Sequence, residues 1–336
     1  MNFADLTTLR VGGPIGSFVE PASAEELVDA VRGADASGTE VLVLGGGSNL
    51  VVGDDGFDGL VVSVAQLTGR QRAGDMWEFS AGVQWDAAVR STVESGCTGL
   101  EALSGIPGTV GGAPIQNVGA YGALTSDVLS SVRVYDRETG AIERWKAEHC
   151  EFGRHRSSVF KRSRRWVILD VQFGLSASPD GRPVAYQALA DELQVEIGTP
   201  VPAPDVRAAV LALRARRGMV LDAADHDTWS VGSFFLNPVL PSVPPAAADG
   251  PQWPDVDGVK LSAAWLIENA GFPKGYGGPL ASLSTKHTLA ITNRGGASAA
   301  DILALAGEIR AGVAAKYGVV LEPECHLINC AIPASP

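Results

Sequence analysis

The sequence lacks the segments and motifs that would place it at once among membrane proteins, hydrolases or nucleotide-triphosphate enzymes. No run of about 18 apolar residues occurs, so we expect no membrane insertion. Residues 1–10 contain Asp5 and no apolar stretch, so we expect no signal peptide and a cytoplasmic protein. Neither Gly-x-Ser-x-Gly nor a glycine loop ending in Gly-Lys-Ser/Thr is present, which removes support for a nucleophile elbow and for a P-loop.

Cysteine and positive charge are also scarce. The four cysteines, Cys97, Cys150, Cys325 and Cys330, form no Cys-x-x-Cys pair, and this scatter favours free thiols over a disulfide framework. Their spacing to histidines matches no common zinc site, so we expect no metal. The net charge of −12 argues against nucleic acid as a partner, although a local basic pocket could still bind a small anion.

Glycine is abundant, with 40 residues, and it gathers in two loops. The first loop is Gly45-Gly46-Gly47-Ser48-Asn49-Leu50, directly after the apolar run 41–44. The second spans residues 105–112 and is followed closely by residues 116–122. Glycines allow a tight turn and bring backbone N–H groups close to a phosphate. The two loops are therefore either simple tight turns or two sides of a site for a ligand that carries a pyrophosphate.

The first loop is a poor Rossmann fingerprint, because residues 50–56 read as a strand and a turn where that motif requires a helix. Around the loops the pattern predicts an α+β fold with many strands, few helices and no regular βαβ alternation. Capping residues predict helices at 24–36 after Ser23, at 206–217 after Asp205, at 263–270 after Ser262 and at 299–317 after Ser298. A further helix is expected at 85–95. Strands are expected at 41–44, 60–64, 77–81, 131–135, 141–145, 166–174 and 319–329.

Several polar residues stand where chemistry is possible, and each also has an ordinary structural interpretation. Ser233 lies between a glycine and two phenylalanines, where its hydroxyl is either a turn serine or a proton donor in an apolar pocket. Glu322 and Glu324 flank Pro323 in the expected last strand, on one face, where a carboxylate needs a partner. His287, before the expected strand 289–292, is either structural or functional.

Arginines provide the candidate anion-binding groups. Arg214 and Arg217 lie one helical turn apart, so both can face one anion or simply end a solvated helix. A basic cluster within residues 154–165 is either a solvated face or the source of one arginine that binds a carboxylate through two hydrogen bonds.

Taken together, these residues resemble the MurB family of UDP-N-acetylenolpyruvoylglucosamine reductases, which acts in peptidoglycan synthesis. The resemblance runs from about Thr8 to Asn329. It rests on the order and spacing of Thr8-Leu9-Arg10-Val11-Gly12-Gly13, residues 45–50, 105–122 and 232–238, and Leu321-Glu322-Pro323-Glu324.

The resemblance implies a two-lobed FAD-binding fold of the p-cresol methylhydroxylase type, followed by a substrate-binding domain. The implied division is residues 1–66 and 67–204 for the two lobes and 205–336 for the substrate domain, with the last strand returning to the FAD domain. It also implies NADPH as the hydride donor, a UDP-sugar as the substrate and a monomeric enzyme.

The resemblance assigns roles residue by residue. Arg156 matches the arginine that binds the substrate carboxylate, Ser233 matches the proton donor, and Glu324 matches the supporting catalytic acid. Tyr186, Arg217, Asn237 and His287 fall at substrate-binding positions. The FAD-binding positions are Gly45, Gly46, Gly47, Ser48, Asn49, Leu50, Ile106, Gly111, Gln116, Asn117, Gly122 and Arg214.

The sequence departs from the family pattern in three places. His155-Arg156-Ser157-Ser158 replaces Tyr-Arg-x-Ser, Arg217 replaces a lysine, and Cys325-His326 follows Glu324 in place of Val-Arg. Two rival functions remain, an alcohol oxidase or dehydrogenase of the same fold and a sugar-nucleotide-binding protein without activity. The absence of a histidine in the early glycine loops weighs against the first, and the joint presence of Arg156, Ser233 and Glu324 weighs against the second.

Overall fold

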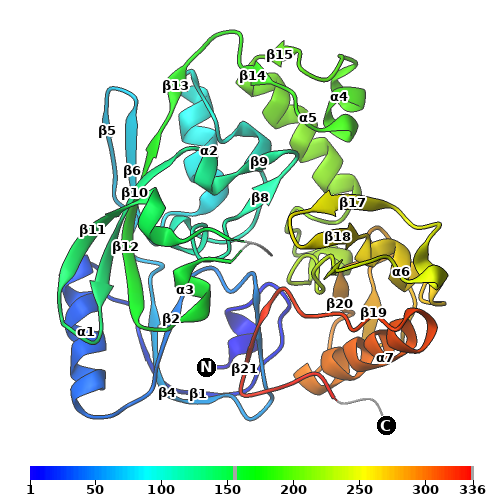
Figure 1. Ribbon diagram of the computed structural model, residues 1–336. Helices are drawn as coiled ribbons and strands as arrows, with labels where there is room; N and C mark the ends of the chain where they lie inside the picture. Colours follow the sequence, from blue (N-terminus) through cyan, green and yellow to red (C-terminus); the bar gives the residue numbers. More distant parts are fainter. Residues whose placement is uncertain (154–156, 334–336) are drawn as a thin grey trace. The chain divides into compact units, whose positions relative to one another are not determined.

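The α+β class predicted from the sequence is confirmed by the computed structural model, which describes residues 1–153 and 157–333 (Figure 1). The chain forms two compact units, each assembled from separate segments of the sequence. Unit 1 contains residues 1–15, 47–57 and the chain from 217 onward; unit 2 contains residues 16–46 and 58–216. The division at residues 66 and 204 into two lobes and a substrate domain stays a prediction.

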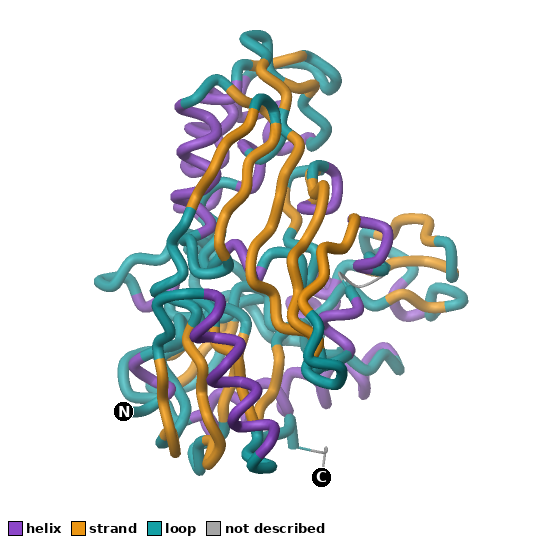
Figure 2. The backbone as a smooth tube through the Cα atoms, turned by 90° about the vertical axis from the view of Figure 1, so that its left-hand side faces the viewer, coloured by secondary structure: helices purple, strands orange, loops and turns teal. Residues whose placement is uncertain are grey.

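The largest sheet lies in unit 2 and is antiparallel throughout. Figure 2 shows its long strands side by side. Their order is β11 (Ile142–Lys146), β10 (Leu129–Asp136), β12 (Trp166–Gly174), β6 (Met76–Ser80) and β5 (Arg70–Ala73). Helix α2 (Trp85–Glu94) shares a core with this sheet, because Trp85 packs edge-on against Phe173, which in turn lies beside Phe79.

A second layer of unit 2 combines a three-stranded sheet with the first helix. The strands β1 (Ile15–Val19), β4 (Phe57–Ser63) and β2 (Val41–Leu44) lie in that order, with β2 and β4 parallel. Helix α1 (Ala24–Ala36) begins where the sequence predicts, since the Ser23 hydroxyl accepts a hydrogen bond from the Glu26 N–H. Its buried face shares a core with β2, β4 and the strands β10 and β12 of the larger sheet.

The remaining elements of unit 2 are short, apart from the 14-residue helix α5. They are β7 (Cys97–Thr98), η2 (Glu101–Leu103), η3 (Val110–Gly112), β8 (Gly119–Ala120), β9 (Ala123–Leu124), η4 (Thr125–Asp127), η5 (Ala147–Cys150), α3 (Val159–Arg162), β13 (Ser176–Ala177), β14 (Arg182–Pro183), α4 (Gln187–Leu193), β15 (Pro200–Val201) and α5 (Ala203–Arg216).

The predicted start of α5 at Asp205 is wrong. The helix begins at Ala203, because the Pro202 carbonyl already accepts hydrogen bonds from the N–H groups of Asp205 and Val206. Pro204 is tolerated there, since the first helical N–H groups have no partner within the helix. Asp205 is therefore a first-turn residue and not the cap.

Unit 1 has its own core, formed by helices and short strands of the C-terminal part together with Leu9, Val11 and Val51. Helix α7 (Ala299–Tyr317) is the longest; a capping box of Ser298 and Asp301 begins it and Gly318, with φ of 68°, ends it, as predicted. The other elements are η1 (Phe3–Asp5), β3 (Leu50–Val52), η7 (His226–Thr228), β16 (Val239–Leu240), η8 (Pro245–Ala247), β17 (Gln252–Asp255), β18 (Gly258–Leu261), α6 (Ala263–Asn269), β19 (Ala281–Leu283), β20 (Ile291–Asn293) and β21 (His326–Ile328).

The predicted last strand, 319–329, is mostly wrong. Only His326–Ile328 forms a strand, β21, which pairs in parallel with β3. Pro323 forms a single bridge with Phe235, and because proline has no N–H the ladder cannot continue through it. Glu322 and Glu324 therefore do not share a strand face; Glu322 is exposed and Glu324 is half-buried.

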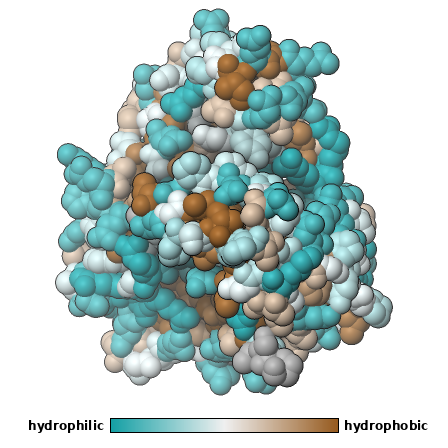
Figure 3. Space-filling model, turned by 45° about the vertical axis from the view of Figure 1, so that its right-hand side comes forward, coloured by the Kyte–Doolittle hydropathy of each residue, from teal (hydrophilic) through white to brown (hydrophobic). Residues whose placement is uncertain are grey.

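On the face drawn in Figure 3 hydrophilic side chains predominate, and the apolar ones form separate patches. Among the described residues no helix is both long and apolar enough to cross a membrane.

All four cysteines are free thiols, as predicted, and burial raises the pKa of Cys150 to about 12.

Candidate active site

Parts of the two predicted glycine loops lie directly against each other inside unit 2. A Cβ atom on Gly46 would lie 2.8 Å from the Gly108 Cα, and one on Gly45 would lie 2.8 Å from the Thr109 hydroxyl oxygen. Both distances are shorter than real Cβ contacts. At Gly45 only the Thr109 side chain would have to move, but at Gly46 the obstacle is backbone, so a side chain there would force the loops apart. Backbone therefore meets backbone here, as a loop that holds a phosphate through N–H groups requires.

The hydroxyl of Thr109 supports the same interpretation. The residue is 4% exposed, and its Oγ1 has no hydrogen-bond partner among the described residues. A buried hydroxyl without a partner is costly, so a ligand oxygen beside the loop would satisfy it. These features fit the pyrophosphate of FAD, the cofactor that the resemblance implies.

The second loop is fixed at both ends by hydrogen bonds. At its start, the Gly105 N–H donates to Asp86 Oδ1 at 2.6 Å, and Arg207 of α5 binds both carboxylate oxygens of Asp86 at 2.6 and 2.7 Å. Burial works against the charge of Asp86, but the Arg207 and Gly105 hydrogen bonds outweigh it and lower the pKa of Asp86. Further on, the N–H groups of Val110 and Gly111 donate to carbonyls beside β6, and a Cβ on Gly111 would collide with Ala81.

The segment after the second loop contains most of the other predicted FAD positions. Asn117 has a φ of 43° and is held by Ser126, whose N–H donates to its Oδ1 at 2.9 Å. This side chain is thus committed to the loop's own structure. Ile106, inside the second loop itself, packs against the core of the large sheet. Gln116 directly precedes Asn117 in the sequence.

A tyrosine pair lies at the end of that segment. The rings of Tyr121 and Tyr186 meet edge to face, with centroids 5.7 Å apart, and a Cβ on Gly122 would touch Ala185. Tyr186 precedes α4 and is 43% exposed, so its phenol can reach a ligand. Arg214 lies in the last turn of α5. Arg216, in the same turn, forms an ion pair with Glu192 of α4.

The remainder of the first loop belongs to unit 1 and leads to Glu324. Gly47 has a φ of 59°, and a Cβ there would lie 2.1 Å from the Leu6 carbonyl oxygen. Two residues further on, the Asn49 carbonyl accepts from the His326 N–H at 3.0 Å, and the Asn49 side-chain amide donates to the Glu324 carbonyl at 3.5 Å. The hydrogen bonds continue into the ladder of β3, which begins at Leu50, and β21.

The Ser233 segment lies beside Glu324 in the same unit. Gly232, with φ of 77°, turns the chain before Ser233, and the next two residues, Phe234 and Phe235, are fully buried. The Phe234 carbonyl accepts from the Glu324 N–H at 2.8 Å, and the Phe234 N–H donates to the Leu289 carbonyl at 2.8 Å. Backbone hydrogen bonds thus bring the predicted proton donor, the predicted acid and the loop that carries His287 into one neighbourhood.

The other predicted substrate residues of unit 1 have different surroundings. The Asn237 side-chain oxygen accepts from the Ala263 N–H at the start of α6, and the residue is exposed. His287 accepts from the Leu289 N–H through Nδ1 at 3.1 Å. Arg217 follows directly after the end of α5 and is half-buried.

Arg156 lies outside the described residues, as does Arg154. The other arginines of the basic cluster form ion pairs in unit 2, and the side chains of Arg162 and Arg164 are about half exposed: Arg162 pairs with Glu151, Arg164 with Glu40, and Arg165 with Asp136 and Glu138. The hydrogen bond from Arg165 keeps the pKa of the buried Asp136 well below its ordinary value.

Sequence analysis missed two residues that shape the cofactor loops, Thr109 and Asp86. Thr109 could have been suspected, because it is the one hydroxyl inside the second glycine loop. Asp86 gives no such signal, because an acidic residue in the first turn of a helix is ordinary.

Comparison with known proteins agrees with this geometry. Residues 16–146 match a model of an FAD binding domain, and residues 224–328 match a model of the UDP-N-acetylenolpyruvoylglucosamine reductase C-terminal domain. The chain is 51% identical to the UDP-N-acetylenolpyruvoylglucosamine reductase of Saccharopolyspora erythraea, over 98% of this chain and 95% of that protein. It is 52% identical to the enzyme of the same name from Nocardia farcinica, over 96% and 87% of the two chains.

A solved structure is similar over the whole length. The MurB crystal structure from Thermus caldophilus matches 98% of this chain and 97% of its own, with 26% identity and a TM-score of 0.67. Half of the positions are thus shared with full-length relatives, and both parts of the chain match their domain models. The chain therefore belongs to the UDP-N-acetylenolpyruvoylglucosamine reductase (MurB) family.

Proposed function

We propose that this chain is an FAD-dependent reductase that uses NADPH to convert UDP-N-acetylglucosamine enolpyruvate to UDP-N-acetylmuramate in peptidoglycan synthesis. The observation that carries the proposal is the arrangement in unit 1, where the Ser233 segment is hydrogen-bonded to the Glu324 segment and to the loop of His287. Membership of the family supplies the identity of the substrate and of the reductant. The enzyme acts in the cytoplasm as a monomer.

The cofactor is held by backbone groups. In unit 2 the bare backbone of Gly45 and Gly46 lies beside the second loop, where Thr109 offers one unsatisfied hydroxyl to a pyrophosphate. FAD bound there would supply the hydride chemistry between NADPH and the terminal carbon of the enolpyruvyl group. The residues of the protein orient the cofactor and the substrate, stabilise the developing negative charge and supply the proton.

Hydride addition leaves negative charge on the neighbouring carbon and on the substrate carboxylate. Arg156 spreads that charge through a bidentate contact with the carboxylate. Ser233 delivers the proton to the carbon. Because serine is a weak acid, its donation relies on the strong basicity of the enolate and on Glu324 close by. Tyr186, Arg217, Asn237 and His287 hold the sugar nucleotide.

One experiment tests the whole proposal. Purified protein should release about one FAD per chain when denatured, lose its yellow colour with NADPH under anaerobic conditions, and regain it on addition of the enolpyruvyl substrate. Protein without flavin would refute the cofactor assignment. Bleaching without recolouring by this substrate would instead favour a flavoenzyme that acts on another compound.

A further inference from the structure

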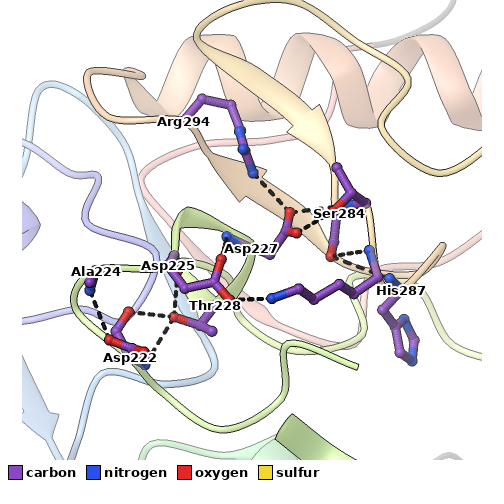
Figure 4. A network of polar contacts seen from close by, with 10 residues as sticks. Asp222, Ala224, Asp225, Asp227, Thr228, Ser284, His287 and Arg294 are labelled. Atoms are coloured by element: carbon purple, nitrogen blue, oxygen red, sulfur yellow. Dashed lines mark hydrogen bonds and ion pairs between the residues drawn. The ribbon is translucent and has the colours of Figure 1, made fainter. Parts of the chain in front are cut away.

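A carboxylate cluster in unit 1 lies directly upstream of Ser233, and none of the roles given above uses it. It centres on Asp227 of η7, whose side chain is 6% exposed. Figure 4 shows Arg294 reaching toward Asp227, with Asp225 and Ser284 close by and the imidazole of His287 pointing away from the two carboxylates.

Asp227 ties together two segments that are distant from it in sequence. Its Oδ1 accepts from the Thr285 N–H at 3.0 Å and from Arg294 Nη1 at 2.8 Å, while its Oδ2 accepts from the Thr285 hydroxyl. Burial opposes the charge, but the hydrogen bonds from Thr285 and the neighbouring guanidinium of Arg294 outweigh it and lower the pKa of Asp227. The carboxylate is therefore ionised and fully engaged near neutral pH.

Thr285 is the second residue of the loop 284–290, which joins β19 to β20 and is hydrogen-bonded to the Ser233 segment. Ser284 closes the neck of the loop, since its N–H donates to the Ala290 carbonyl at 2.8 Å and its hydroxyl accepts from the N–H groups of Lys286 and His287. At the far end of the loop, the Leu289 carbonyl accepts from the Phe234 N–H. A displacement of Thr285 would therefore reach both His287 and the residue that follows Ser233.

The chain between Asp227 and Ser233 is fixed at two points. The Trp229 carbonyl accepts from the Asn293 N–H at 3.0 Å, and the Ser230 carbonyl accepts from the Thr8 hydroxyl at 2.7 Å. Gly232 then turns it with a positive φ, and a Cβ there would meet no atom within 4 Å. A glycine turn in open space does not by itself fix the next side chain. The restraints after Ser233 are the two hydrogen bonds of Phe234, one to the Leu289 carbonyl of the loop and one from the Glu324 N–H.

We infer that Asp227 is a positioning residue for the proton-delivery step, acting through Thr285 and the 284–290 loop on Ser233 and His287. The inference rests on the proposed function, in which Ser233 protonates the substrate. A shift of about 1 Å at a reacting group costs up to roughly 10²-fold in rate, so even a modest relaxation of this loop should be measurable.

The test compares the two half-reactions in Asp227→Asn and in a matched control, Asp301→Asn. Asp301 is also a carboxylate with a lowered pKa that anchors backbone in unit 1, but its partner is Ser298 at the start of α7. With FAD content equal, bleaching by NADPH should stay within about 2-fold of wild type in both variants. Recolouring by substrate should slow about 10-fold or more in Asp227→Asn only.

A second comparison separates positioning from general loosening. In a Ser233→Ala background, Asp227→Asn should slow recolouring by less than about 2-fold, because the group that it positions is gone. The full effect in that background, or equal slowing of both half-reactions, would overturn the inference. If Asp227→Asn does not fold, Thr285→Val against Thr285→Ser makes the same test, since serine keeps the hydroxyl that donates to Asp227.

The outcomes also keep this inference apart from the proposed function. Wild-type protein that is not recoloured by the enolpyruvyl substrate contradicts the function itself. Wild-type protein that is recoloured, with Asp227→Asn equal to Asp301→Asn, contradicts only the role of Asp227.

Discussion

Replacing Gly46 by alanine should release FAD from the enzyme, because the two glycine loops of unit 2 leave no room for one methyl group. The new Cβ would lie 2.8 Å from the Cα, 3.2 Å from the carbonyl carbon and 3.5 Å from the nitrogen of Gly108. All three are backbone atoms, so no flexible side chain can move aside. Relief to an ordinary contact of 3.4 Å requires about 0.6 Å of separation, the difference between 3.4 and 2.8.

The cost of this change follows from the same contact. Inserting a methyl group into a well-packed site costs about 1–3 kcal/mol, and it is paid either as strain or as displaced loops. If the cofactor holds the loops at their present separation, the full cost appears in its affinity. At about 1.4 kcal/mol per factor of ten, FAD binding should weaken roughly 5-fold to 150-fold.

Apoprotein titrated with FAD, followed by quenching of flavin fluorescence, measures the affinity directly. Gly33→Ala is the matched control, because it lies in α1 of the same unit and its Cβ would meet no atom within 4 Å. That variant should keep wild-type affinity and gain slightly in stability, as alanine favours helix. Equal FAD affinity in Gly46→Ala and Gly33→Ala would show that these loops do not hold the cofactor.

Three further predictions concern protonation, substrate binding and acid stability. Ser233→Ala should leave bleaching by NADPH within a few-fold of wild type and slow anaerobic recolouring by about 10²-fold, measured by stopped-flow absorbance, and an unchanged recolouring rate would mean that another group delivers the proton. Tyr186→Phe and Arg217→Ala should weaken substrate binding more than flavin reduction; unchanged affinity in both would leave these residues a structural role. The lowered pKa of Asp136 means that its stabilising contribution is present above the unfolded value of about 3.9 and is lost as pH falls below it. Asp136→Asn should therefore lower the denaturant midpoint at pH 7, with a difference from wild type that shrinks toward pH 3, and a difference independent of pH would contradict the ion pair with Arg165.

The helix starts could be predicted because their signals are local. Ser23 with Glu26 and Ser298 with Asp301 lie three residues apart, so both partners of each cap are visible in a short stretch of sequence. Strand β5 was missed for the opposite reason. All four of its residues are exposed, so it shows no apolar alternation, and only pairing with β6 makes it a strand.

Backbone-mediated binding was also open to prediction, although its geometry was not. Glycine at Gly45 and Gly46 is itself the signal, because a position that needs bare backbone excludes every other residue. The sequence does not indicate that Gly46 packs against Gly108, because the two residues lie in separate loops. Loop-to-loop contact of this kind is decided by the packing of the whole unit.

Side-chain positioning leaves no comparable trace in sequence. Asp227 meets Thr285 and Arg294 across 58 and 67 residues, and an aspartate in a polar turn looks the same whether its partners are protein groups or water. The same is true of Ser233 and Glu324, which hydrogen bonds through Phe234 bring together. A family resemblance can name the residues that touch the substrate, but the residues that hold them emerge only from the contacts. A supporting residue acts only by keeping its partners in place. A substitution that restores its hydrogen bond should therefore restore the rate of recolouring by substrate. Replacing a proton donor by a residue that cannot give up a proton should not be corrected in this way.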